Sequence, residues 1–178
     1  MLSYVPHARS RLPEGGVYNR VFATMKYSRP PRRLNRMFAD APVFFITCCT
    51  YRKRAKLANA PFHNAFVRFG ERAASDFNIT VGRYVIMPDH LHFFVAGPNE
   101  FDLGNWVGVL RRRLLGAVPE TNSDAPLWQR GFFDHVLRGD ESYAQKWDYV
   151  RANPVRAGLV NDPDAWPFAG EIGVIDRV

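Results

Sequence analysis

The stretch NITVGRYVIMPDHLHFFVAGP, residues 78–98, decides the fold because it joins two strand-like runs through a short turn. Both runs are rich in β-branched and aromatic residues, which favour strands. Pro88 and Asp89, which lie between the runs, are typical turn residues. The sequence therefore predicts an antiparallel hairpin whose second strand begins at His90.

The second strand of this hairpin carries two histidines, His90 and His92, separated by one residue. Successive side chains of a strand point to opposite faces, so both imidazoles share one face. The opposite face is apolar and is expected to be core: Leu91, Phe93 and Val95. Two neutral imidazoles on one face can bind a metal ion. They can also be half-buried polar residues on a solvated face, and the spacing alone leaves both interpretations open.

On the N-terminal side of the hairpin, the pattern predicts one strand and one helix. Residues 41–51 (APVFFITCCTY) are aromatic and β-branched, as in a strand. Residues 58–77 carry phenylalanines at helical spacing. Asn59 stands at the N-cap position of this expected helix and Pro61 near its first residue, which is where these residue types are favoured.

On the C-terminal side, the pattern predicts a helix at about 102–118, a strand at 131–138 and a third helix within 140–154 that Pro154 must end. The order strand, helix, strand, strand, helix, strand is the split arrangement of a ferredoxin-like domain. We therefore expect an α+β fold, a βαββαβ antiparallel sheet with an appended C-terminal helix. Because this fold hosts many functions, the chemistry must be argued from particular residues.

The composition indicates one domain with a basic N-terminal arm. The chain has 178 residues, of which 47% are hydrophobic, enough for a single core. Of the net charge of +7, residues 1–40 contribute +6, in a segment with little periodicity. Such an arm is often a contact to nucleic acid, because phosphates attract it. It can also be a disordered leader, or the product of a start codon assigned upstream of the domain.

The sequence contains neither a predicted membrane span nor a signal peptide. No apolar stretch approaches the roughly 18 residues that a span needs, and the N-terminus lacks an apolar signal region. We therefore expect a cytoplasmic protein with no membrane partner. Cys48 and Cys49 are adjacent in a predicted strand and point to opposite faces, so we expect small core residues without a disulfide.

The third helix combines an apolar stripe with a separate polar face. At about 100° per residue, the stripe consists of Tyr143, Trp147 and Val150. Tyr149 lies about 90° or more from this stripe, and Lys146 and Asn153 lie on the same side as Tyr149. This polar face offers a candidate nucleophile, a cation and an oxygen donor. A surface tyrosine with solvated neighbours gives the same pattern.

Four segments resemble one known family when they are taken together and in order: MPDHLH (87–92), LWQRGFFDHVLR (127–138), DYVRANPVRAGLV (148–160) and DPDAWPF (162–168). They are similar to the REP-associated tyrosine transposases, relatives of the IS200/IS605 transposases among the HUH single-strand nucleases. HUH denotes histidine, bulky hydrophobe, histidine. The resemblance covers about residues 41–168 and leaves 169–178 as a C-terminal tail.

The resemblance implies a metal-dependent transposase that cuts and rejoins single-stranded DNA. His90 and His92 would bind a divalent cation, Mg²⁺ or Mn²⁺, with Asn153 as the third protein ligand, where IS200-type relatives have glutamine. Tyr149 would attack the scissile phosphate and form a 5′-phosphotyrosine. The sequence names no clear base for Tyr149, and Lys146 is a candidate auxiliary.

The resemblance also implies the partners of the chain. The DNA would be single-stranded or hairpin DNA with REP-like palindromes, the chain a monomer or a homodimer, and its location a bacterial cytoplasm at the nucleoid. His135 is a second candidate auxiliary, although a role in the core or in DNA contact is as consistent. Candidate DNA-binding cations are Arg52, Lys53, Arg54, Arg111, Arg112 and Arg113.

Two other functions stay open from the residues. One is a noncatalytic nucleic-acid-binding module on the same fold, in which strand aromatics stack on bases. The other is a metal-dependent phosphoesterase that uses water instead of a tyrosine. The first needs neither the histidines nor Tyr149, and the second needs only the histidines.

Overall fold

The computed structural model describes residues 42–118, 125–137 and 143–175, and the predicted basic arm lies outside these residues. The strands are β1 (Val43–Cys49), β2 (Thr80–Ile86), β3 (His90–Ala96), β4 (Phe133–Leu137) and β5 (Ala169–Glu171). The α-helices are α2 (Ala60–Phe77), α3 (Leu103–Leu115), α4 (Tyr143–Arg151) and α5 (Asn153–Arg156), and the 3-10 turns are η1 (Tyr51–Lys53) and η2 (Pro163–Ala165). No helix in this described part is long and apolar enough to cross a membrane.

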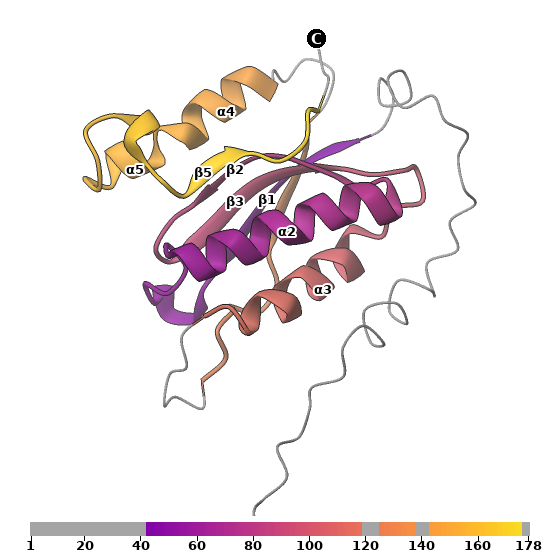
Figure 1. Cartoon of the computed structure of the whole chain (residues 1–178), viewed down its shortest axis with the longest axis horizontal. Helices are drawn as coiled ribbons and strands as arrows, with labels where there is room; N and C mark the ends of the chain where they lie inside the picture. The colour runs from indigo at the N-terminus through magenta and orange to yellow at the C-terminus, as the bar shows by residue number, and fades with distance from the viewer. Residues whose placement is uncertain (1–41, 119–124, 138–142, 176–178) are drawn as a thin grey trace, which may run out of the picture. The chain divides into compact units, whose positions relative to one another are not determined.

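The strands form one antiparallel sheet in the order β4-β1-β3-β2-β5 (Figure 1). The predicted hairpin is confirmed, because β2 pairs with β3 antiparallel and places Ile86 opposite Leu91. Strand β1 pairs with both β3 and β4. The first four strands, with α2 and α3 between them, give the predicted ferredoxin-like βαββαβ order.

Helices cover both faces of the sheet. Helices α2 and α3 pack on one face, where Phe66 and Trp106 contact Phe93 at ring-centroid distances of 5.6 and 6.1 Å. Helix α4 lies on the other face, where the Tyr143 ring is 4.5 Å from that of Phe94. The predicted alternation of the β3 side chains between the two faces of the sheet is therefore confirmed, because Phe93 and Phe94 pack on opposite faces.

Two helix boundaries follow from local chemistry. Helix α2 begins where the Asn59 side chain accepts a hydrogen bond from the N–H of Phe62 at 3.0 Å, which is the predicted cap. Helix α4 ends before Pro154, as predicted. Pro154 then lies in the first turn of α5, where a residue without an N–H is tolerated.

The sheet continues past the predicted boundary at residue 168. Strand β5 pairs with β2 and places Gly170 opposite Tyr84, and Ile175 is buried in the core under α4. Residues 169–175 therefore belong to the packed domain and not to a tail, whereas residues 176–178 lie outside the described residues. The sequence pattern missed β5 because the strand is short and contains a glycine, which is required here: a Cβ on Gly170 would lie 2.9 Å from the Tyr84 hydroxyl.

We expect the substitution Ile175→Ala to lower the free energy of unfolding by about 2–4 kcal/mol, because it removes a side chain that is only 7% exposed. Chemical denaturation measures this change. The matched control is the neighbouring Val174→Ala, which alters a side chain that is 79% exposed and should change stability by less than about 0.5 kcal/mol. Equal effects of the two substitutions would mean that this segment does not belong to the core.

Candidate functional site

The face of the sheet under α4 carries both histidines. Residues directly opposite each other on paired strands share a face. Thr47 is opposite His92 on one side and Phe133 on the other, and Phe45 is opposite His135. We call this surface the histidine face: Phe45, Thr47, His90, His92, Phe133 and His135.

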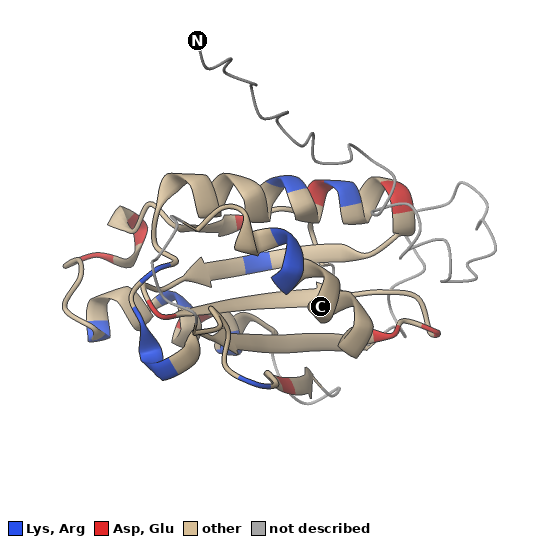
Figure 2. Ribbon diagram, turned by 90° about the horizontal axis from the view of Figure 1, so that it is seen from below, with Lys and Arg blue, Asp and Glu red and all other residues tan. Residues whose placement is uncertain are grey.

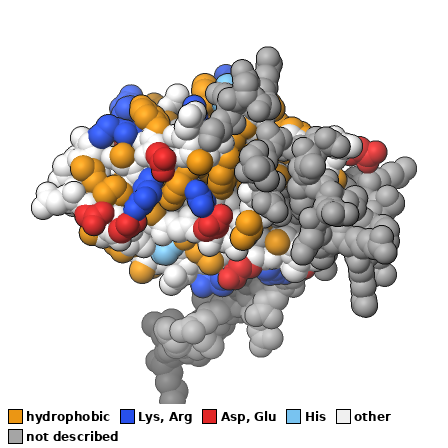
Figure 3. Space-filling view, turned by 90° about the horizontal axis from the view of Figure 1, so that it is seen from above, with side chains coloured by type: hydrophobic (Ala, Val, Ile, Leu, Met, Phe, Trp, Pro, Cys, Tyr) orange, Lys and Arg blue, Asp and Glu red, His pale blue; other side chains and the backbone are white. Residues whose placement is uncertain are grey.

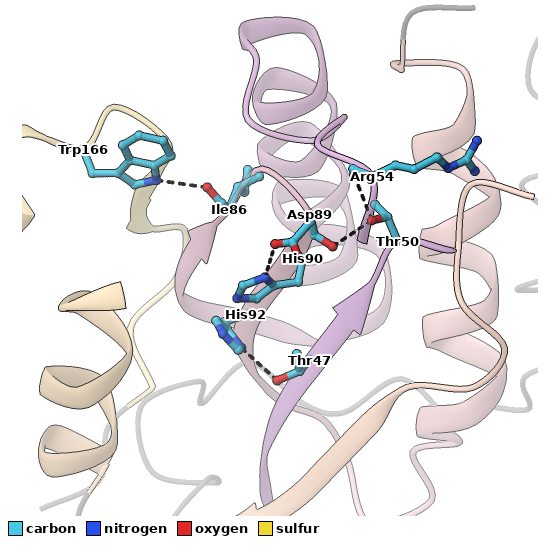
Figure 4. Close-up of polar contacts among 8 residues, drawn as sticks. All are labelled: Thr47, Thr50, Arg54, Ile86, Asp89, His90, His92 and Trp166. Carbon is cyan, nitrogen blue, oxygen red and sulfur yellow. Dashed lines mark hydrogen bonds and ion pairs between the residues drawn. The ribbon is translucent and has the colours of Figure 1, made fainter. Parts of the chain in front are cut away.

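Each histidine is held through its Nδ1 atom, and the two rings lie next to each other with centroids 4.6 Å apart (Figure 4). Nδ1 of His90 is 2.6 Å from the Asp89 carboxylate, so Nδ1–H donates to this carboxylate and Nε2 takes no part in the hydrogen bond. Nδ1 of His92 is 2.8 Å from the Thr47 hydroxyl. In both rings, Nε2 is the nitrogen that these hydrogen bonds leave available.

The turn before the histidines is fixed by Thr50, which is fully buried. The backbone N–H and the side-chain hydroxyl of Thr50 donate to the Asp89 carbonyl at 2.8 and 3.0 Å. This fixes Asp89 beside His90. Sequence reasoning missed Asp89 and Thr47 as site residues. The position of Asp89 next to His90 was an available signal, whereas Thr47 is recognisable only from the strand register.

His92 is neutral at physiological pH. Burial is the main cause that lowers its pKa to about 3. His90 and Arg156 lower this pKa further, Asp89 raises it by a smaller amount, and Lys146 lowers it by the smallest amount. A neutral imidazole is the form that binds metal ions. The effects of Arg156 and Lys146 also show that both cations lie near this ring.

Helices α4 and α5 bring the predicted tyrosine face to the histidine face. Tyr143 and Val150 are buried and Trp147 packs partly against the same core, which confirms the predicted apolar stripe. Tyr149 is 65% exposed. The Lys146 ammonium lies 5.2 Å from the centre of the Phe45 ring, above β1.

Arg156 ties Tyr149 to Asn153. Its Nη2 donates to the Tyr149 carbonyl at 2.7 Å and to Oδ1 of Asn153, and its guanidinium lies 4.2 Å from the centre of the Tyr149 ring. Sequence reasoning missed this residue. In the sequence, only its position seven residues after Tyr149, two helical turns further along, indicated that Arg156 could lie near this tyrosine.

The donor atoms at this site suit a small divalent cation. Among the described residues, no three His, Cys, Asp or Glu side chains come together where a metal could bind. A cation would therefore rely on His90 and His92 and on an oxygen such as Oδ1 of Asn153. Imidazole and amide oxygen are acceptable ligands for Mn²⁺ and, with water or phosphate oxygens, for Mg²⁺. The residues present fit such an ion.

The first cluster of predicted DNA-binding residues lies beside this site, but its members differ. Arg52 and Lys53 are exposed and have φ values of 55° and 52°, a left-handed conformation that costs energy for side chains of this kind. Both residues belong to η1, which follows Thr50, and Thr50 is hydrogen-bonded to the Asp89 carbonyl. Arg54 instead donates to the carbonyls of Tyr51 and Pro126 and so braces the backbone.

The second cluster lies on α3, on the opposite face of the sheet. Arg111 donates to the carbonyls of Gln129 and Gly131 and lies 5.4 Å from the centre of the Trp128 ring. Arg112 and Arg113 are exposed. The structure therefore does not bring this cluster together with the histidines.

Lys and Arg residues lie on several separate elements of the described part of the chain. Figure 2 shows Lys and Arg on several helices and turns. The face seen in Figure 3 has Lys and Arg interspersed with Asp, Glu and hydrophobic side chains. His135 is half-buried on β4 and is separated from His92 by β1.

The comparison with family models decides the family of the chain. Residues 40–153, more than half of the chain, match the model described as Transposase IS200 like. The chain belongs to this transposase family. The resemblance that the sequence motifs indicated is therefore confirmed.

Individual members of the transposase family agree with this assignment. The chain is 23% identical over 145 residues to a protein of Haemophilus influenzae assigned as a REP-associated tyrosine transposase, covering 75% of this chain and 82% of that one. It is 27% identical over 90 residues to the REP-associated tyrosine transposase of Escherichia coli K12, covering 50% of this chain and 52% of that one.

A solved structure has the same fold. The structure of a REP-associated tyrosine transposase bound to a REP hairpin superposes with a TM-score of 0.59 at 19% identity. The superposition covers 85% of this chain and 99% of the other. It confirms the predicted α+β architecture of the transposase.

Proposed function

We propose that this transposase cleaves and rejoins single-stranded DNA next to a hairpin, through a 5′-phosphotyrosine at Tyr149. The observation that carries the proposal is the meeting of two oriented, adjacent imidazoles with the α4–α5 segment that presents Tyr149, Asn153 and Arg156. A noncatalytic binding module has no need of this combination. The name of the structural neighbour, which is bound to a REP hairpin, supports hairpin DNA with REP-like palindromes as the substrate class.

The proposed metal ligands are Nε2 of His90, Nε2 of His92 and Oδ1 of Asn153, for Mg²⁺ or Mn²⁺. When bound, the cation would withdraw negative charge from the scissile phosphate and stabilise the transition state. Asp89 and Thr47 would orient the two rings through Nδ1. Arg156 would have to release Oδ1 of Asn153, or share it, when the ion binds.

The proposed chemistry exchanges one phosphodiester for another. The Tyr149 oxygen forms a bond to phosphorus and loses its proton to solvent. The bond from phosphorus to the 3′ oxygen breaks, and this oxygen takes up a proton to leave as a free 3′-OH. The reverse reaction rejoins the strand, so no ATP is needed. A phenol is mostly neutral near pH 7, so it needs activation. Lys146 and Arg156 would favour the phenolate by their charge, and His135 stays a candidate for DNA contact.

The proposed DNA path runs past the histidine end of the sheet. The exposed Arg52 and Lys53 beside the Asp89 turn are the cations that we assign to phosphate contact in this region. Arg54 and Arg111 would support DNA binding only indirectly, because their guanidinium groups are bonded to backbone carbonyls. Arg112 and Arg113 would contact DNA only where it wraps to the α3 side.

The test is a covalent complex. We would incubate the full chain with labelled hairpin DNA from the flanks of its own gene, with Mn²⁺ or with a chelator, and look for protein–DNA adducts that survive SDS. An adduct formed only with metal supports the proposal. Metal-dependent cutting without an adduct would instead indicate a phosphoesterase that uses water, and binding without cutting would indicate a binding module.

We expect Asp89→Asn to weaken Mn²⁺ binding about 10–100-fold, because a carboxylate that accepts from a metal-binding histidine fixes its tautomer and raises its basicity. Calorimetry or Mn²⁺ electron paramagnetic resonance measures this affinity. The control is Asp134→Asn, an exposed carboxylate on β4 whose side chain lies on the opposite face. Equal Mn²⁺ affinities of wild type and Asp89→Asn would remove Asp89 from the site.

A further inference from the structure

Phe133 is a large aromatic side chain that is exposed at the edge of the sheet. It is 58% exposed and lies on β4, which is an edge strand of the sheet. Among the described residues, its ring makes no aromatic contact. A single exposed apolar side chain is ordinary on a protein surface, so the informative feature of Phe133 is the face of the sheet on which it stands.

The register places Phe133 on the histidine face. Phe133 is opposite Thr47, and Thr47 is opposite His92 and is hydrogen-bonded to it. These three residues therefore form a row across three adjacent strands. Since neighbouring strands are about 4.8 Å apart, Phe133 stands roughly 10 Å from His92 across the sheet.

We propose that Phe133 is a stacking site for an unpaired base of the DNA strand, close to the phosphate that is cut. This inference rests on the proposed function and adds a contact to a base. Every base has a flat π-face, so an exposed aromatic ring on a nucleic-acid-binding sheet is a sequence-tolerant platform. Such a contact would hold the strand in register while the phosphate lies at the histidines.

The cations over the histidine face favour a nucleic acid as the occupant of Phe133. Lys146 lies above Phe45, which neighbours Thr47 on this face of β1, and Arg156 lies close enough to His92 to lower the pKa of that imidazole. These cations would hold phosphates while the ring holds a base. The neighbours of Phe133 on the same face are the half-buried Thr47 and His135, so the ring stands among polar groups instead of in a broad apolar patch.

A second copy of the chain is the main alternative occupant, because an edge strand can pair with another edge. Such an interface would bury Phe133 between two β4 strands and would not need the DNA. The two occupants are separable, since self-association depends on protein concentration and base stacking depends on the presence of bases.

The experiment compares two probes, oligothymidylate of about 20 nucleotides and an abasic phosphodiester oligomer of the same length. Binding is measured by fluorescence anisotropy with a chelator present, so that no cutting is needed. We expect Phe133→Ala to weaken binding of oligothymidylate about tenfold and to leave binding of the abasic oligomer unchanged. Phe133→Trp should retain binding, and Phe133→Leu should behave like the alanine variant because it is apolar but not flat.

Asp134→Ala is the matched control, an exposed residue of the same strand whose side chain faces the α3 side. Equal loss on both probes, no loss on either, or no binding of oligothymidylate by the wild type would overturn the proposal. So would a wild-type dimer in sedimentation that Phe133→Ala converts to a monomer. If the stacking test fails but the covalent adduct forms, only the proposed stacking site is wrong. If binding depends on bases as expected but no adduct forms, only the proposed cleavage chemistry is wrong.

Discussion

Replacing Tyr149 with phenylalanine is expected to abolish the covalent protein–DNA complex while leaving the fold and DNA binding intact. The ring of Tyr149 is 65% exposed, and its hydroxyl makes no hydrogen bond to the described residues, so removing that oxygen costs little stability. The ring would still lie under the Arg156 guanidinium. Only the attacking oxygen is lost, and the adduct assay should therefore fall below detection.

The matched control for this substitution is Tyr143→Phe on the same helix. The Tyr143 hydroxyl accepts a hydrogen bond from the backbone N–H of Arg83 at 3.1 Å and is buried, so its loss should lower stability by about 1–3 kcal/mol. The adduct should nevertheless form. An adduct that persists in Tyr149→Phe and disappears in another tyrosine variant would assign the nucleophile elsewhere.

Replacing His92 with alanine is expected to weaken Mn²⁺ binding by more than about 100-fold and to remove metal-dependent cutting. Burial keeps this imidazole neutral and Thr47 fixes its orientation, so the substitution removes an oriented member of the three proposed ligands. The variant also loses a ring that stacks on Phe45 at 5.4 Å. Its melting temperature must therefore be measured beside its affinity for Mn²⁺.

His63→Ala separates the loss of a ligand from the loss of a histidine in general. His63 belongs to α2, on the other side of the sheet from the histidine face, and its Nε2 is hydrogen-bonded to the Tyr84 hydroxyl at 2.7 Å. This variant should lose stability but retain Mn²⁺ affinity and cutting. If His92→Ala, still folded, bound Mn²⁺ as tightly as the wild type, the proposed metal site would be wrong.

Most of the fold was predictable because periodicity reports burial directly. The alternation around His90 gave the hairpin and its two faces, and the spacing of Tyr143, Trp147 and Val150 separated the packed side of α4 from Tyr149. Strand β5 was not predictable, because a strand of three residues with a central glycine has no periodic pattern to detect. Its existence depends on pairing with β2, which is a tertiary contact.

The site was predictable only in part, because charge and residue type do not reveal how a side chain is used. The charge of Arg54 and Arg111 predicts contact with DNA, yet the guanidinium groups of both residues donate hydrogen bonds to backbone carbonyls. Thr47 carried no signal, since its contact with His92 depends on strand register. The spacing of Arg156 from Tyr149 allowed a contact, but only the structure shows the guanidinium over the tyrosine ring.

The contact between Arg156 and Asn153 has a consequence for the order of binding. The proposed site offers two imidazoles and an amide, with the cations Arg156 and Lys146 close to His92 and the Asp89 carboxylate in contact with His90. A divalent cation alone would meet repulsion there, and the DNA backbone alone would meet attraction. Each ligand would then raise the affinity for the other by the same factor, as thermodynamic linkage requires. The transposase alone would consequently bind the metal ion more weakly than the transposase loaded with DNA.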